Sequence, residues 1–236
     1  LLFIKKYLRF YKFSYSFVGG NINIKKHKGK NIIFSHSLDY NNYLDSTHLT
    51  KPIDENYIVY IDQMYTSHPE YDFLKIPSFI DKNFFYDLEL FFKALTKKYN
   101  KKIIICAHPK AKRDDQYLKN FENIVFDQLD LYTKQADLVV AHDSIGINYP
   151  ILFKKPLYLL SIPGMEMSNK YDNINLMSKK LGCNFIDIKN FDFKNLEDIK
   201  TVDNEKYEKY IKDYIKFGGE KINSWKILSK SLLNKE

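Results

Sequence analysis

Long apolar runs are missing from this sequence, and cysteine is scarce. None of the apolar stretches approaches the roughly 20 residues that a helix needs to cross a bilayer, so we do not expect an integral membrane protein. The two cysteines, Cys106 and Cys183, stand far apart and in no metal-ligand spacing. We therefore expect neither a disulfide scaffold nor a cysteine zinc site, and a reducing cytoplasm is the expected compartment.

Arginine is also scarce, although the chain is basic. Its 37 lysines and arginines outnumber the 29 acidic residues and give a net charge of +8, yet Arg9 and Arg113 are the only arginines. Proteins that read nucleic acids depend on arginine for bidentate contacts to phosphates and bases. The lysines here are spread along the chain among acidic residues. We interpret the charge as a solvated surface and expect no nucleic-acid partner.

Several signature motifs are absent as well. The chain has no G-x-G-x-x-G dinucleotide loop and no Walker phosphate loop. None of the six histidines stands in an H-x-x-x-H or H-E-x-x-H pattern, so we expect no metal. Residues 1–17 mix apolar, aromatic and basic side chains without the cleavage site of a signal peptide. We predict that they form a packed helix, and the alternative is an amphipathic segment on anionic lipid.

The sequence does contain enough apolar residues for a core, at 44% of the chain. From residue 57 onward, short β-branched apolar runs alternate with stretches of helical spacing, which predicts an α/β, Rossmann-like parallel sheet with helices on both faces. The predicted strands are 57–61, 102–106, 124–126, 137–141, 156–160 and 184–186. The predicted helices are 83–99, 114–120, 129–135, 145–153 (with Pro150 bending or shortening it), 169–181, 204–217 and 220–233.

The first part of the chain is less regular. Gly19 and Gly20 mark a break, residues 31–35 predict a short strand, and residues 36–43 are interpreted as a loop. We expect residues 1–56 to be the remnant of an incomplete first domain with a linker. Residues 57–236 are expected to form the Rossmann-like domain together with the C-terminal helices.

Candidate site residues follow from this sheet, because ligands bind open parallel sheets at the carboxyl ends of the strands. Polar and titratable residues gather there. They are Asp62 and Gln63 after the first strand of the domain, His108, Pro109 and Lys110 after the second, and His142, Asp143, Ser144 and Gly146 after the fourth. We predict that His108 and Ser144 meet in one anion-binding site.

Two of these groups suit a phosphate. Pro109 fixes the backbone beside His108, whose imidazole can donate to a phosphate oxygen while Lys110 adds charge. Ser144 begins a predicted helix, where free N–H groups favour an anion. The alternative is that Ser144 or its neighbour Asp143 only caps that helix. Gly146 would allow a ligand or a strand to approach closely.

Asp62 is the candidate catalytic base, since a carboxylate at this edge can take a proton from an acceptor hydroxyl. Alternatively it caps the next turn or pairs with a lysine. Gln63, His68 and Glu70 belong to the following loop, which carries a second His-Pro pair. We expect this loop either to close over the substrate or to be a plain surface loop.

Several segments together resemble bacterial surface-carbohydrate biosynthesis proteins of the GT-B glycosyltransferase type. They are residues 35–44 (SHSLDYNNYL), 59–63 (VYIDQ), 86–92 (YDLELFF), 103–110 (IIICAHPK) and 136–146 (ADLVVAHDSIG). The similarity covers roughly residues 31–161. It implies a domain like the C-terminal half of a GT-B enzyme.

The His-Pro pair followed by a serine motif is similar to bacterial sialyltransferases and Kdo transferases. In those enzymes, the two motifs bind the phosphate and ribose of a CMP-linked acidic sugar, and these roles would fall on His108 and Ser144. The base usually comes from the N-terminal domain, which is largely missing here. Either the chain is a C-terminal fragment, or Asp62 serves as the base, or the protein is not a complete transferase.

The resemblance implies a metal-independent, inverting glycosyltransferase of capsule or lipopolysaccharide biosynthesis. Its expected partners are a nucleotide-sugar donor, CMP-linked in preference to UDP-linked, and a glycan or lipid-linked glycan acceptor. No other cofactor is expected, and the protein would contact the inner face of the plasma membrane at most peripherally. Two alternatives stay open: a nucleotide-sugar 2-epimerase, and a non-catalytic scaffold that binds nucleotide or glycan.

Overall fold

The computed structural model describes residues 16–21, 31–49, 53, 56–69, 83–165, 169–192 and 196–233. The chain divides into two compact units: residues 1–44 with 209–236, and residues 45–208. The pairing of the C-terminal residues with the N-terminal ones was not part of the expectation from the sequence. The predicted domains, 1–56 and 57–236, stay a prediction.

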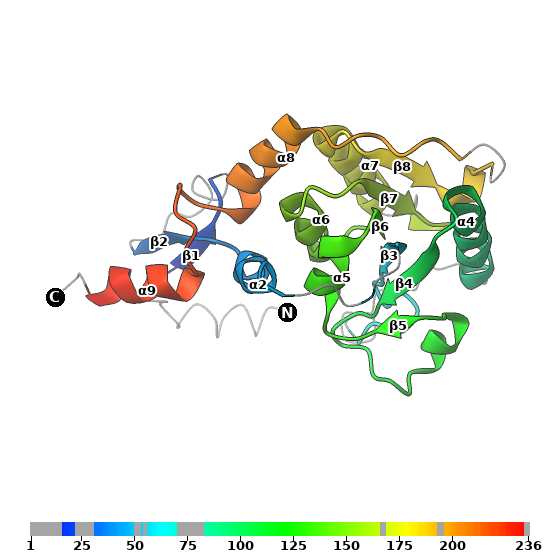
Figure 1. Cartoon of the computed structure of the whole chain (residues 1–236), viewed down its shortest axis with the longest axis horizontal. Coiled ribbons are helices and arrows are strands. Elements are labelled where there is room, and N and C mark those ends of the chain that lie inside the picture. Colours follow the sequence, from blue (N-terminus) through cyan, green and yellow to red (C-terminus); the bar gives the residue numbers. More distant parts are fainter. Residues whose placement is uncertain are drawn as a thin grey trace, which may run out of the picture. The chain divides into compact units, whose positions relative to one another are not determined.

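The second unit is built on a six-stranded parallel sheet (Figure 1). Its strands are β3 (Tyr57–Ile61), β4 (Lys102–Cys106), β5 (Ile124–Val125), β6 (Leu138–Ala141), β7 (Leu157–Ser161) and β8 (Asn184–Asp187). They stand in the order β5-β4-β3-β6-β7-β8. The chain thus adds β4 and β5 on one side of β3, then returns to place β6 on the other side. The predicted α/β fold is confirmed.

Helices cover both faces of this sheet, and side-chain alternation along β3 shows which helix lies on which face. Tyr60 packs edge-on against Phe92 of α4 (Phe84–Tyr99), with ring centroids 5.1 Å apart. Tyr57, which points to the opposite face, contacts Tyr132 of α5 (Leu129–Gln135). Because both faces are covered, β3 is apolar and buried along its whole length.

Two further helices lie on the face of α5. Phe185 of β8 is in register with Leu159 of β7, Ala141 of β6 and, through the sheet, Ile61 of β3. Phe185 contacts Tyr171 of α7 (Asn169–Leu181), so α7 shares that face. The other helix, α6 (Asn148–Leu152), packs on α5.

Pro150 explains why the predicted helix at 145–153 is shortened. The structure has a 3₁₀ turn, η3 (Ile145–Ile147), followed by the five-residue α6. Pro150 is the third residue of α6, in the first turn, where its missing N–H costs no hydrogen bond. A second predicted helix, 114–120, is the 3₁₀ helix η2 (Gln116–Asn120). A third 3₁₀ turn, η5 (Ile188–Asn190), follows β8.

The first unit contains a two-stranded parallel sheet of β1 (Ser16–Gly19) and β2 (Ile32–Ser35). The predicted loop at 36–43 is wrong, because helix α2 (Leu38–Ser46) lies there. Its apolar spacing is weak, and tertiary contacts hold it instead, with Tyr40 buried and Asn41 Oδ1 accepting from Ser224 N. Residues 1–15 of the predicted N-terminal helix lie outside the described residues, and Ser16 and Phe17 belong to β1.

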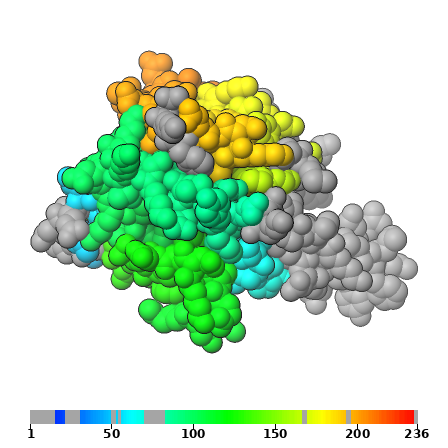
Figure 2. Space-filling model, turned by 90° about the vertical axis from the view of Figure 1, so that its right-hand side faces the viewer, coloured from blue at the N-terminus to red at the C-terminus, as the bar shows by residue number. Residues whose placement is uncertain are grey.

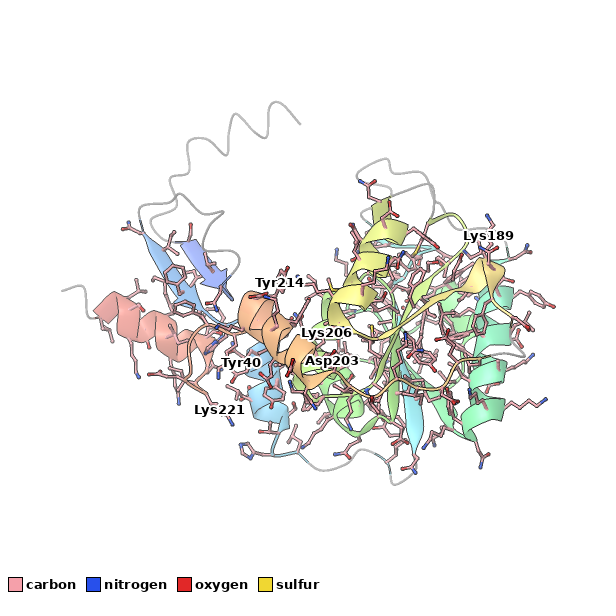
Figure 3. The ribbon with its side chains drawn as sticks, turned by 90° about the horizontal axis from the view of Figure 1, so that it is seen from above. Tyr40, Lys189, Asp203, Lys206, Tyr214 and Lys221 are labelled. Atoms are coloured by element: carbon pink, nitrogen blue, oxygen red, sulfur yellow. The ribbon has the colours of Figure 1, made fainter. Side chains whose placement is uncertain are left out.

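Three C-terminal elements complete the structure: α8 (Asn204–Tyr210), the π-helical η6 (Ile211–Ile215) and α9 (Ser224–Leu233). Asp203 precedes α8, and its carboxylate accepts a hydrogen bond from Lys206 N at 3.1 Å and forms an ion pair with Lys206 Nζ at 3.2 Å (Figure 3). Within the first unit, Phe217 N donates to His36 Nδ1, and Ser224 Oγ donates to the His36 carbonyl.

Among the described residues, no helix has the length and apolar character to cross a membrane.

Candidate functional site

The strand order identifies one edge of the sheet as the place where a ligand would bind. The direction of chain progression reverses between β3 and β6, and ligands of open α/β sheets bind at such a switch point, outside the carboxyl ends of the strands. The segments after β3, β4 and β6 carry the predicted site residues. Since β4 and β6 both pair with β3, the structure brings all three segments to this edge.

Gln63 and Ser144 meet here directly. Gln63 Nε2 donates to Ser144 Oγ at 2.6 Å, and Gly146 N donates to the same oxygen at 3.0 Å. Ser144 therefore caps the η3 turn, as the alternative interpretation held, and is also joined to the end of β3. No local pattern predicts this pairing, which spans 81 positions.

Gly146 lies so close to the sheet that a side chain at this position would have little room. A Cβ at this position would lie 3.0 Å from Leu129 Cδ2 and 3.2 Å from Ile61 Cγ2. Packing of η3 on β3 and α5 therefore accounts for the glycine. Of the two explanations that the sequence suggested, approach to a neighbouring strand is the one that the structure supports.

His108 lies beside His68, which belongs to the other His-Pro pair of the chain. Their rings meet edge to face with centroids 4.9 Å apart, and both residues are half-buried. His108 Nδ1 accepts from Lys110 N at 3.2 Å, which assigns the proton of the neutral ring to Nε2. Pro109 and Lys110 are exposed, and Glu70 lies outside the described residues. The loop after β3 thus reaches His108, as well as Ser144 through Gln63.

Asp62 is buried and accepts three hydrogen bonds. Oδ1 accepts from Met64 N at 3.0 Å, and Oδ2 accepts from Tyr117 OH at 2.7 Å and from His108 N at 3.3 Å. Burial, and then the charge of Asp62, raise the pKa of Tyr117, which keeps its hydroxyl protonated as a donor. The carboxylate therefore links the end of β3 to the His108 loop and to η2. Its role as a catalytic base stays a prediction.

His142 is buried completely and belongs to the core. Its Nδ1 lies 2.9 Å from the Leu160 carbonyl, which can only accept, so Nε2 accepts from Tyr60 OH, also at 2.9 Å. Burial lowers the pKa of His142 to about 4. The prediction that His142 contacts the nucleotide is therefore corrected, because its imidazole is not accessible to a ligand. Its neighbour Asp143 is exposed and lies 3.7 Å from Lys170 Nζ.

The helix expected to bind a phosphate at its N-terminus is too short for that purpose. The elements after Ser144 are a three-residue 3₁₀ turn and a five-residue helix, so few peptide dipoles are aligned toward the edge. The expected contribution of a helix dipole is corrected accordingly. In the described part of the chain, no group of three His, Cys, Asp or Glu residues is arranged to hold a metal ion.

No protein-family model and no curated protein matches the sequence. Among solved structures, the chain is similar to the spinosyn forosaminyltransferase SpnP, with a TM-score of 0.37 and 12% identity over 70% of this chain and 39% of that one. It is also similar to the UDP-GlcNAc 2-epimerase of Methanocaldococcus jannaschii, with a TM-score of 0.47 and 13% identity over 90% of this chain and 57% of that one. The chain thus spans less than two thirds of either protein, and similarities of this size assign it to no family.

Proposed function

We propose that the second unit binds a nucleotide sugar at the carboxyl edge of β3, β4 and β6, and that the protein is a glycosyltransferase of surface polysaccharide assembly. One observation carries the proposal. The loop after β3 contacts both candidate ligand groups, Ser144 through Gln63 and His108 through His68. Residues from three strand ends thereby converge at the switch point of the sheet.

The hydrogen-bond pattern assigns a donor to each group. Ser144 Oγ accepts two hydrogen bonds, so its own hydroxyl proton can be donated to a ribose or phosphate oxygen. The Nε2–H of His108 is the donor of that ring, and the exposed Lys110 adds positive charge beside it. His108 and Lys110, without a metal, would stabilise the leaving phosphate.

Asp62 helps to position His108. By accepting the backbone N–H of His108, its carboxylate fixes the start of the loop that carries the imidazole. To act as the base, Asp62 would have to exchange one of its three donors for the hydroxyl of the acceptor. In the proposal it is primarily a positioning residue for His108.

The finer parts of the proposal rest on the resemblance of the His-Pro and serine motifs. They favour a CMP-linked acidic sugar over a UDP-sugar as donor. The acceptor is a glycan or a lipid-linked glycan, used at the cytoplasmic face of the inner membrane.

Calorimetric titration with CMP, CDP and UDP tests the site. We expect CMP to bind the wild-type chain, and His108→Ala to weaken that binding by tenfold or more, while His48→Ala at an exposed position leaves it unchanged. If none of the three nucleotides binds, the scaffold interpretation replaces the proposal.

Turnover then separates the two enzyme classes. A transferase releases CMP from a CMP-sugar only when an acceptor glycan is present, apart from slow hydrolysis. An epimerase converts a nucleotide sugar in the absence of any acceptor. Conversion without acceptor would contradict the glycosyltransferase assignment while leaving the nucleotide site in place.

A further inference from the structure

A pocket of about 490 Å³ lies on the α4 face of the sheet, apart from the candidate nucleotide site. One wall is α4, the floor is β4, and the opposite wall is the segment 120–123 that leads into β5. Figure 2 shows this side of the molecule, with α4 in blue-green and the segment after β4 in green. None of Asp62, Gln63, His108 and Ser144 lines it.

The pocket exists because the connection from β4 to β5 contains no long α-helix. Parallel strands are usually joined by an α-helix that covers the sheet. Here the connection contains the five-residue η2, so the sheet beside α4 is left partly uncovered. Ile103 and Ile105, which alternate along β4 and share a face, form the floor.

The apolar end of the pocket is aromatic. Phe85 and Phe92 of α4 and Phe121 of the opposite wall are half-buried. The centroid of the Phe121 ring lies 5.8 Å from that of Phe85 and 6.5 Å from that of Phe92. Phe121 thus contacts both other rings, and the three rings, which border a cavity, offer an apolar surface to a ligand.

The other end is basic. Phe85, Glu89, Lys93 and Lys97 follow one another at i+4 spacing and so share one stripe of α4, which changes from aromatic in its first turn to cationic in its last two. The helix runs back along the sheet between two parallel strands, so Lys97 at its end is close to Lys102 at the start of β4. Both lysines line the pocket.

Charge at the pocket is unevenly matched. Three lysines and two glutamates line it, and Glu89 is ion-paired with Lys93 one helical turn away. The other carboxylate in the lining belongs to Glu122. Three lysines against two glutamates leave the lining with a net positive charge, and Lys97 and Lys102 lie away from the aromatic rings.

We propose that this pocket binds a small amphipathic anion, with an apolar chain or ring against Phe85, Phe92 and Phe121 and a phosphate or carboxylate at Lys97 and Lys102. A volume of about 490 Å³ is of the size that holds small-molecule ligands. The proposal is independent of the nucleotide site on the strand edge, because the two share no residue.

Decyl phosphate below its micelle-forming concentration is the probe, compared with decyltrimethylammonium and inorganic phosphate. We expect decyl phosphate to bind at least tenfold more tightly than either, because only it combines an apolar chain with a negative head. Amide chemical shifts should change on α4 and in residues 120–123. Equal binding of the cationic and anionic amphiphiles, or shift changes confined to other elements, would overturn the proposal.

Charge reversal provides the matched control. Lys97→Glu should weaken decyl phosphate binding tenfold or more, whereas Lys179→Glu, at an exposed lysine in the last turn of α7, should have no effect. Lys97→Gln, which removes the charge with less cost to the helix end, should give a smaller loss of about threefold. An unchanged affinity in both Lys97 variants, with thermal unfolding showing a folded chain, would rule out the proposed anion end.

Discussion

Tyr117 donates a hydrogen bond of 2.7 Å to the buried carboxylate of Asp62, from a 3₁₀ helix 55 positions further along the chain. The same carboxylate oxygen accepts the backbone N–H of His108. One buried charge thus joins the end of β3 to two segments that follow β4. Charge-assisted hydrogen bonds of this kind are stronger than neutral ones, so they can fix the geometry of a candidate site.

Tyr117→Phe is expected to destabilise the fold by about 1–3 kcal/mol, because it leaves a buried carboxylate with one donor fewer. Urea unfolding at neutral pH measures the loss. Tyr86→Phe, at an exposed position on α4, should stay within about 0.5 kcal/mol of wild type. Equal stability of the two variants would mean that the Asp62–Tyr117 hydrogen bond contributes nothing.

Ser144→Ala should lower stability by about 1 kcal/mol, since it removes the cap of η3 and the acceptor for Gln63. It should also weaken CMP binding if the Ser144 hydroxyl contacts the ligand. Ser144→Thr keeps the hydroxyl and should retain most of both properties, while Ser67→Ala in the exposed loop after β3 should change neither. A loss of stability with unchanged CMP affinity would reduce Ser144 to a structural cap.

His142 predicts a pH dependence of stability. Its pKa in the folded chain, about 4, is below the ordinary value of 6.5, so between these pH values only the unfolded chain binds a proton at this ring. The contribution of His142 to stability is therefore complete above pH 6.5. It is lost as the pH drops toward 4, by about 3 kcal/mol at most. Burial also lowers the pKa of His36, which adds a loss of the same sign.

The measurement is the free energy of unfolding of wild type and His142→Gln at several pH values between 7 and 4.5. The variant should lose stability less steeply with falling pH, whatever its stability at pH 7. Parallel curves for the two proteins would show that His142 is not held neutral by burial.

Two glycines separate backbone strain from steric clash. Gly20 and Gly218 have φ of +70° and +69°, but a Cβ at Gly20 would clash with the Asp213 carbonyl oxygen, whereas one at Gly218 would meet nothing within 4 Å. Gly218→Ala should cost about 1 kcal/mol through the left-handed backbone alone. Gly20→Ala should cost about 3 kcal/mol, because the clash adds to it. Thermal and urea unfolding compare them, and similar values would contradict the close packing of Gly20 on η6.

Local sequence patterns were sufficient to predict much of the sheet and the residues that follow its strands. Strands β3 and β4 and helices α5 and α7 have the predicted bounds, because unbroken apolar runs and regular helical spacing leave little choice. The strand-end rule then placed Asp62, His108 and Ser144 at one edge. It could not say which of their atoms are already bonded within the protein.

The amino-acid sequence by itself determined the alternation of strands and helices, and hence which residues follow the strands, since that information lies in neighbouring residues. Tertiary structure decided what depends on residues far apart. It buried His142 between Tyr60 and Leu160, joined Asp62 to Tyr117, and made a helix of residues 38–46. In each case, packing against distant segments outweighed a weak or ambiguous local preference, and no pattern within a short stretch of chain records such contacts.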